Sequence, residues 1–132
     1  MATVSTVGIR LGLPLALAAL GAGACLNGHP DIAIAENSSG GNPARGQAII
    51  QQYGCGSCHE IPGVAGAHGL VGPPLLWFAR RSYVAGELPN TADNLALWIR
   101  TPQKIHPRTA MPAVGLDEQQ TRDVVAYLYT LR

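Results

Sequence analysis

The stretch Cys55-Gly56-Ser57-Cys58-His59 places two thiols three residues apart and an imidazole directly after the second thiol. Thiols at this spacing can share one helical turn, and the histidine is then held beside whatever the thiols bind. Four chemistries use such a pair: covalent haem attachment, thiol–disulfide exchange, zinc binding and a plain disulfide. The rest of the sequence decides among them.

Haem attachment fits this motif and its surroundings best. C-x-x-C-H is the spacing of c-type haem attachment, in which Cys55 and Cys58 form thioethers with one haem and His59 becomes an axial ligand of the iron. A thioredoxin-like pair requires a βαβ context, which no segment shows, and a disulfide within C-x-x-C is strained. A zinc site needs more ligands, and His68 and His106 stand at spacings that match no common zinc pattern. The sequence therefore predicts one covalently bound haem c with its iron.

The second axial ligand is expected to be Met111. A methionine paired with histidine is the usual ligand set of haem proteins that transfer electrons, and it raises the reduction potential. The only other methionine is Met1, so Met111 is the sole thioether outside the N-terminal segment. Its loop, residues 107–112, begins and ends with proline and is therefore stiff, which suits a weak ligand. His68 and His106 are the rival sixth ligands.

Charge and composition restrict the partners and the kind of core. From residue 42 onward, eight Lys/Arg and six Asp/Glu give a formal charge of +2. Nucleic-acid binding needs a clustered basic face, so we expect no nucleic-acid partner. Aromatic residues make up only 5% of the chain. A domain of about 90 residues with so few large side chains would be marginally stable, so a buried cofactor would strengthen the core.

The first 26 residues are expected to be an export signal or an N-terminal anchor. Arg10 is their only charged side chain, and the apolar run at 11–26 is just shorter than the roughly 18 residues of a spanning helix. Three interpretations stay open: cleavage at an A-x-A site before Cys25 or before Glu36, lipidation of Cys25, or retention as an anchor. Residues 27–41 are predicted to form a flexible tether because they are polar and rich in glycine.

The remainder of the chain, residues 42–132, is predicted to form an all-α domain with long loops. Four helices are expected, at about residues 43–53, 75–83, 92–101 and 117–131. Asn42 is a good N-cap for the first helix, and Thr91 or Asn90 for the third. Asp117 and Gln120 have the spacing of a capping box at the start of the fourth. No segment shows the alternation of a strand.

Residues 42–132 resemble a class I cytochrome c, and in particular the haem-c domains fused to subunit II of bacterial cytochrome c oxidases. The matching stretches are GQAIIQQYGC (46–55), GPPL (72–75), AGELPNT (85–91), NLALWI (94–99), Pro102-Gln103, Met111-Pro112 and Ala126-Tyr127-Leu128. The resemblance implies a class I cytochrome c fold, with about four helices around one covalently bound haem. The oxidase-fused relatives also carry an upstream copper-binding domain, which residues 1–41 are not expected to form.

The resemblance implies further roles for particular residues. Pro73 would accept a hydrogen bond from the Nδ1–H of His59 and so fix the orientation of the ring. Trp98 would pack near Met111, and Thr109 would lie close to a haem propionate. The first and last helices would cross at Gly46, Ile50, Val124 and Tyr127.

The implied function is the transfer of single electrons in a respiratory chain, by a carrier rather than an enzyme. The expected partners are redox proteins such as a terminal oxidase, a bc-type complex or a dehydrogenase. The chain would be a free carrier or a fixed subunit of a membrane oxidoreductase. We expect a bacterial periplasmic location, with membrane attachment through residues 11–26 or a lipidated Cys25 as one arrangement.

Two further expectations concern the surface and the chemistry. Small residues around positions 56–68 would leave a low, apolar docking face at the haem edge, which suits the small interfaces of redox encounters. An enzyme or gas sensor with an open iron position, such as a peroxidase, is a third class of function. The presence of Met111 argues against it.

Overall fold

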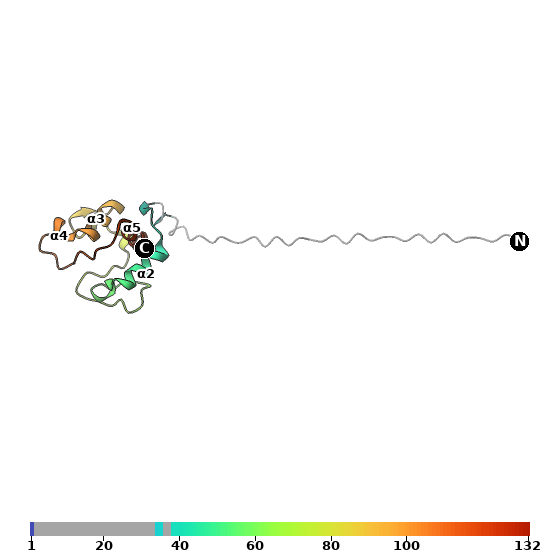
Figure 1. Cartoon of the computed structure of the whole chain (residues 1–132), viewed down its shortest axis with the longest axis horizontal. Helices are drawn as coiled ribbons and strands as arrows, with labels where there is room; N and C mark the ends of the chain where they lie inside the picture. The colour runs from blue at the N-terminus through green and yellow to red at the C-terminus, as the bar shows by residue number, and fades with distance from the viewer. Residues whose placement is uncertain (2–33, 36–37) are drawn as a thin grey trace.

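The computed structural model describes Met1, residues 34–35 and residues 38–132. The predictions for residues 2–33, including Cys25, lie outside the described residues. From residue 42 onward the elements are α2 (Pro43–Gln52), the 3₁₀ turns η1 (Cys55–Ser57) and η2 (Phe78–Arg80), strands β1 (Tyr83–Val84) and β2 (Leu88–Pro89), and helices α3 (Ala92–Arg100), α4 (Pro102–Ile105) and α5 (Glu118–Thr130) (Figure 1). Within the described part of the chain, no helix combines the length and apolar character needed to cross a membrane.

Three of the four expected helices begin at their predicted caps. The side chains of Asn42 and Thr91 each accept a hydrogen bond from the backbone amide three residues later. Asp117 and Gln120 form the complete capping box, with bonds of 2.7 and 3.0 Å. Each bond satisfies an amide that the first helical turn cannot pair internally. The helices expected at 43–53, 92–101 and 117–131 are therefore confirmed to within a residue at each end.

Helices α2 and α5 cross in close contact (Figure 1). A Cβ atom added to Gly46 would overlap the backbone carbonyl of Asp123 and would lie 3.0 Å from the Cβ of Tyr127. Only glycine therefore allows the two backbones to approach this closely. Ile50 and Val124, on the same faces, are buried in the core.

A buried carboxylate joins the start of α2 to the middle of α5. Asp123 accepts hydrogen bonds from Nε and Nη2 of Arg45, at 2.8 and 2.9 Å, and from the amide of Asn42 at 2.7 Å. Burial alone would raise the pKa of Asp123. The hydrogen bonds from Arg45, Asn42 and Gln119 and the charge of Arg45 together outweigh burial, so the pKa lies below its ordinary value.

The prediction of a helix at 75–83 is wrong, because only the short 3₁₀ turn η2 forms there, followed by strand β1. Trp77 has a left-handed backbone, with φ of 50°, which a continuous helix does not accommodate. The Nδ2 group of Asn90 donates hydrogen bonds to the carbonyls of Phe78 and Arg81, at 3.1 and 3.0 Å. A side chain from elsewhere thus satisfies carbonyl groups that a helix would have paired internally.

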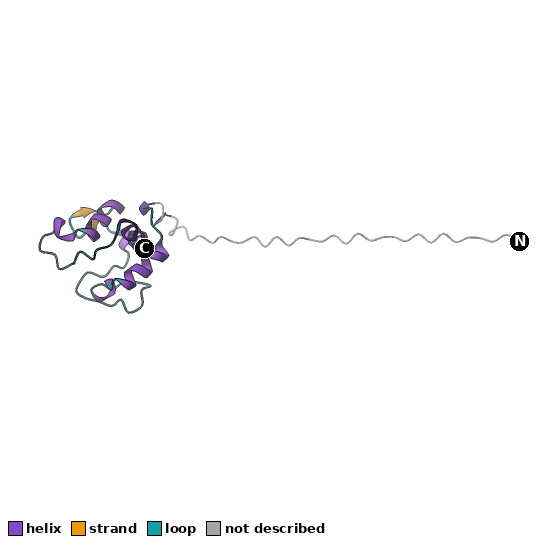
Figure 2. Cartoon of the chain, viewed as in Figure 1, coloured by secondary structure: helices purple, strands orange, loops and turns teal. Residues whose placement is uncertain are grey.

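A two-stranded hairpin follows, where no strand was expected (Figure 2). In it, Val84 lies opposite Leu88 in an antiparallel register. Ala85 and Gly86, between the strands, both have positive φ, at 53° and 73°. Two residues per strand are too few for a detectable alternation of polar and apolar side chains.

The core lies where α2, α3 and α5 meet. Its largest fully buried side chains include Ile50, Leu95 and Val125, one from each helix. Long loops connect these helices (Figure 2) and contribute further buried side chains, among them Ile61 and Leu116. Helices and loops together enclose the cavity described next.

Candidate functional site

One cavity of about 590 Å³ brings the predicted site residues together. Helices α3 and α5 contribute apolar side chains to its wall, including Leu95, Ile99, Val124 and Leu128. The predicted site residues that line it are Cys55, Cys58, His59, Pro73, Trp98, Thr109 and Met111. Segments far apart in the sequence therefore meet around a single, mainly apolar space.

The turn that carries the two cysteines is a compact 3₁₀ structure. Gly54 ends α2 with φ of 67°, a conformation that glycine adopts without strain. The amides of Cys58 and His59 both donate to the carbonyl oxygen of Cys55, at 3.2 and 3.0 Å. Both thiols are free and partly buried. Burial is the main cause that raises the pKa of the Cys55 thiol above its ordinary value.

The ring of His59 is fixed from two sides. Its Nδ1 atom lies 2.8 Å from the carbonyl oxygen of Pro73, the contact that the resemblance implies. A Cβ atom added to Gly72 would overlap the ring, so the ring occupies space that only glycine leaves open. With Nδ1 engaged as a donor, Nε2 is the ring nitrogen that can act as a ligand.

The backbone of Met111 is held at both of its polar groups. Its amide donates to Oγ1 of Thr109 at 3.2 Å, and its carbonyl accepts from Nε2 of Gln103 at 2.7 Å. Thr109 thus holds the amide of Met111, and its hydroxyl hydrogen stays available for another acceptor, as its predicted role beside a propionate would require. Trp98 is partly buried against the same core as Met111. Sequence analysis missed the contact of Gln103, because it joins residues across a loop.

The two rival histidines occupy different places. His106 lines the cavity, and its Nδ1 atom lies 3.0 Å from a carboxylate oxygen of Glu87. His68 is exposed, does not line the cavity and pairs with Glu60 in an isolated β-bridge. His106 is therefore the one rival of Met111 within reach of this space.

Arg81 is a cavity residue that sequence analysis missed. It is the only Lys or Arg among the described residues that line the cavity. Its guanidinium donates to the carbonyl of Pro74 and lies 5.3 Å from the centre of the Phe78 ring. No local pattern in the sequence could predict that Arg81 lines the cavity, because the residue falls in a segment that was expected to be helical.

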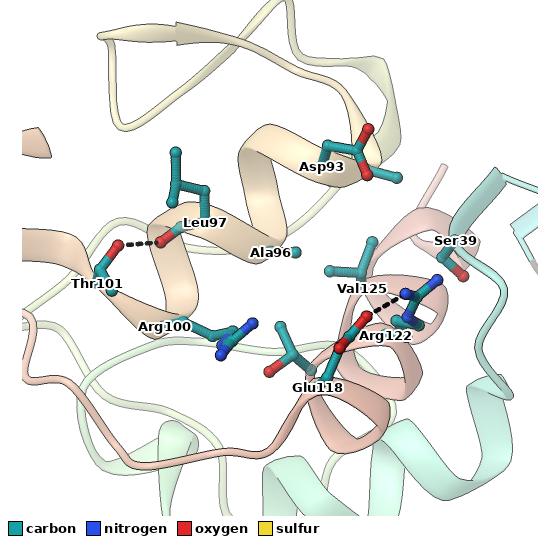
Figure 3. A pocket seen from close by; sticks show the side chains of 11 residues that line it. Ser39, Asp93, Ala96, Leu97, Arg100, Thr101, Glu118, Arg122 and Val125 are labelled. Atoms are coloured by element: carbon teal, nitrogen blue, oxygen red, sulfur yellow. Dashed lines mark hydrogen bonds and ion pairs between the residues drawn. The ribbon is translucent and has the colours of Figure 1, made fainter.

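A smaller hollow of about 380 Å³ lies on the other faces of α3 and α5 (Figure 3). Arg122 and Glu118 pair along α5, and Arg100 of α3 points toward Glu118. The hydrogen bond from Arg122 is the main cause that lowers the pKa of Glu118. Among the described residues, no cysteine, histidine or methionine lines this hollow.

The larger cavity fits a haem. Its volume lies within the roughly 300–1,000 Å³ of cofactor sites, and its walls are mainly apolar. Two thiols stand beside a histidine and a methionine, which are donors for thioether bonds and for iron. In the described residues, no group of three or more His, Cys, Asp or Glu is arranged to hold a metal ion without a cofactor.

Comparison with known protein families decides the identity. The family model described as cytochrome c matches residues 43–132, more than half of the chain. The chain belongs to the cytochrome c family. The predicted class I cytochrome c fold is thereby confirmed. As a cytochrome c, the chain binds haem c covalently, with its iron, and is an electron carrier.

One relative supports the more specific resemblance. Cytochrome c oxidase subunit 2 of Alkalihalophilus pseudofirmus is 33% identical over 89 residues, which are 67% of this chain and 25% of the relative. The predicted likeness to the oxidase-fused haem-c domains is confirmed. The chain spans about a quarter of the length of the curated relative that it matches.

Proposed function

We propose that Cys55 and Cys58 bind a single haem through thioether bonds, that His59 and Met111 are its axial ligands, and that the chain transfers single electrons in a respiratory chain. One observation carries this proposal. The two thiols, the imidazole and the only methionine outside the N-terminal segment line the same cavity, although they come from two separate loops.

The residues of the chain hold the proposed ligands in place. The bound haem supplies an iron that gains and loses one electron. The Pro73 carbonyl fixes the His59 ring, and hydrogen bonds hold both polar groups of the Met111 backbone. The walls of the cavity are mainly apolar. Ligands held in this way keep their positions in both oxidation states, as electron transfer requires.

The proposed partners are redox proteins: a terminal oxidase, a bc-type complex or a dehydrogenase. The similarity to a protein named as an oxidase subunit favours an oxidase. Contact would be made through a docking face that consists of residues 56–68, as expected from the sequence, extended by Leu70 and Val71. These two side chains are 86% and 75% exposed. Glu60 is the only Asp, Glu, Lys or Arg from residue 56 to residue 79, so this face suits a largely uncharged, apolar partner surface.

The proposed location is the bacterial periplasm. Residues 1–26 would be the export signal or an anchor, residues 27–41 the tether, and residues 42–132 the haem domain. A free carrier and a fixed subunit of a membrane oxidoreductase are distinguished by the mature N-terminus. Mass spectrometry of the natively exported protein measures haem addition, cleavage and lipidation together. A start at Glu36 favours the free carrier, and a lipidated Cys25 or a retained segment favours the fixed subunit.

Absorption spectroscopy of the haem-loaded protein tests the ligand assignment. We expect a low-spin spectrum with a sulfur-to-iron band near the red end, and loss of this band in Met111→Leu. The matched variant His106→Leu alters the rival ligand in the same cavity and should keep the band. A high-spin wild-type spectrum would favour an open iron position. A low-spin wild-type spectrum without this band that becomes high-spin in His106→Leu would assign the ligand to His106.

A further inference from the structure

The loop that carries Met111 is tied to the rest of the domain by a hydrogen bond from Gln103. The Nε2 group of Gln103, in helix α4, donates to the carbonyl oxygen of Met111 over 2.7 Å. Helix α4 begins immediately after α3 and is anchored by Pro102, whose side chain is buried. The bond therefore connects a largely exposed loop to a helix that packs against the core.

A second tie joins the start of the same loop to the hairpin. His106 follows helix α4, and its backbone carbonyl accepts the amide of Thr109 at 3.0 Å. Its ring lies 3.0 Å from the carboxylate of Glu87, in the turn between β1 and β2. Ala85 and Gly86 of this turn also line the cavity. The pair thus bridges two walls of the cavity that no regular secondary structure connects.

We propose that Gln103 and the Glu87–His106 pair are positioning residues that keep the Met111 loop closed over the cavity. They set how often Met111 leaves the sixth position and an outside ligand can enter. This inference rests on the proposed function, because it takes Met111 as the axial ligand. The inference concerns residues that would not themselves bind the iron and that lie in or beside helix α4 and the hairpin.

The physical argument is a local opening equilibrium. An outside ligand binds only the open form, so its apparent dissociation constant falls as the open fraction rises. Loss of one hydrogen bond changes such an equilibrium about two- to ten-fold. The side chains of His106 and Glu87 are 45% and 47% exposed, so water weakens the contact between them, and its loss changes the equilibrium about two- to five-fold.

Imidazole titration of the oxidised, haem-loaded protein measures this opening. Imidazole displaces the methionine sulfur, so the sulfur-to-iron band disappears as it binds. We expect Gln103→Leu to tighten imidazole binding about two- to ten-fold. Lys104→Leu is the matched control, since Lys104 is the next residue, is exposed and makes no side-chain hydrogen bond or ion pair that the described residues show. It should leave the affinity unchanged.

A double-mutant cycle tests the second tie. Glu87→Ala and His106→Ala should each tighten imidazole binding about two- to five-fold, and the double variant should match either single variant. Multiplied effects in the double variant would overturn the pairing. An unchanged affinity in Gln103→Leu would overturn the role of Gln103. If Gln103→Leu fails to retain haem, Gln103→Glu keeps the length but loses the donor when ionised, and it should act in the same direction.

Two further observations separate the possible failures. A purely structural role would shift the urea midpoint of unfolding without changing imidazole affinity, and that result would overturn the proposal. A wild-type protein without the sulfur-to-iron band would instead refute the assignment of Met111, and would do so before any variant is compared.

Discussion

Gly46 of helix α2 lies directly against the backbone carbonyl of Asp123 in helix α5. Gly46→Ala would force these helices apart, because the added Cβ meets backbone atoms that cannot rotate away. We expect it to lower the free energy of unfolding of the haem-loaded protein by about 1–3 kcal/mol or more, measured by urea denaturation. Ala48→Gly, at an exposed position of the same helix, should cost only about 1 kcal/mol. Equal losses in the two variants would contradict the close crossing.

The buried carboxylate of Asp123 predicts a specific acid response. Its pKa is lower in the folded chain than in the unfolded chain, where it is about 3.9. Its contribution to stability is therefore complete above the unfolded pKa and is lost as the pH falls through the folded pKa. Asp123→Asn should be less stable than the wild type at neutral pH, by about 1.5–3 kcal/mol, and the difference should shrink below about pH 4.

Urea denaturation of wild type and Asp123→Asn across this pH range measures the effect. Asp93→Asn removes an exposed carboxylate and is the control. A difference between wild type and Asp123→Asn that stayed constant down to pH 2, well below about 3.9, would show that the carboxylate is not specially stabilised.

The contact between Gly72 and the His59 ring predicts a spectroscopic effect. Gly72→Ala places a methyl group in the space of the ring, so the imidazole must tilt or leave its contact with Pro73. We expect a partly high-spin absorption spectrum and a changed reduction potential. Pro74→Ala alters an exposed neighbour but keeps its carbonyl group, and should keep the wild-type spectrum. An unaltered spectrum for Gly72→Ala would mean that the ring is free to move.

The exposed apolar side chain of Val71 predicts where a redox partner binds. Val71→Glu adds a charge to the proposed docking face and should slow electron transfer to the partner by about ten-fold, the effect of roughly 1.4 kcal/mol. Leu97→Glu places the same charge beside the smaller hollow, where Leu97 is 49% exposed, and should not change the rate. Stopped-flow kinetics measure both. The wild-type rate should depend only weakly on ionic strength, and a steep dependence would argue for a charged interface.

Local signals in the sequence were sufficient for much of the fold. Asn42, Thr91 and Asp117 are N-caps whose bonds lie within three residues, so the helix starts could be predicted closely. The C-x-x-C-H motif is also local, and it predicted the chemistry of the site. The prediction of a helix at 75–83 failed because two carbonyl groups there accept hydrogen bonds from Asn90, which lies outside the segment.

The unpredicted parts of the site share one physical cause. Arg81, Gln103 and Glu87 act through hydrogen bonds to groups that only folding brings near, and no periodicity marks them. Pro73 and Met111 could be named in advance, the first from a family resemblance and the second because no other thioether competes. When the chemistry of a site requires a particular residue type, a single residue of that type can predict the ligand as well as a sequence motif does.

The two hollows lie on different faces of the same two helices, and Ser39 lines the smaller one. Gly41, two residues later, is buried against the backbone of Arg122 in α5. In the proposed tethered form, the chain would therefore enter the domain at a different face from the haem cavity. Attachment and electron exchange would then use different surfaces of the domain.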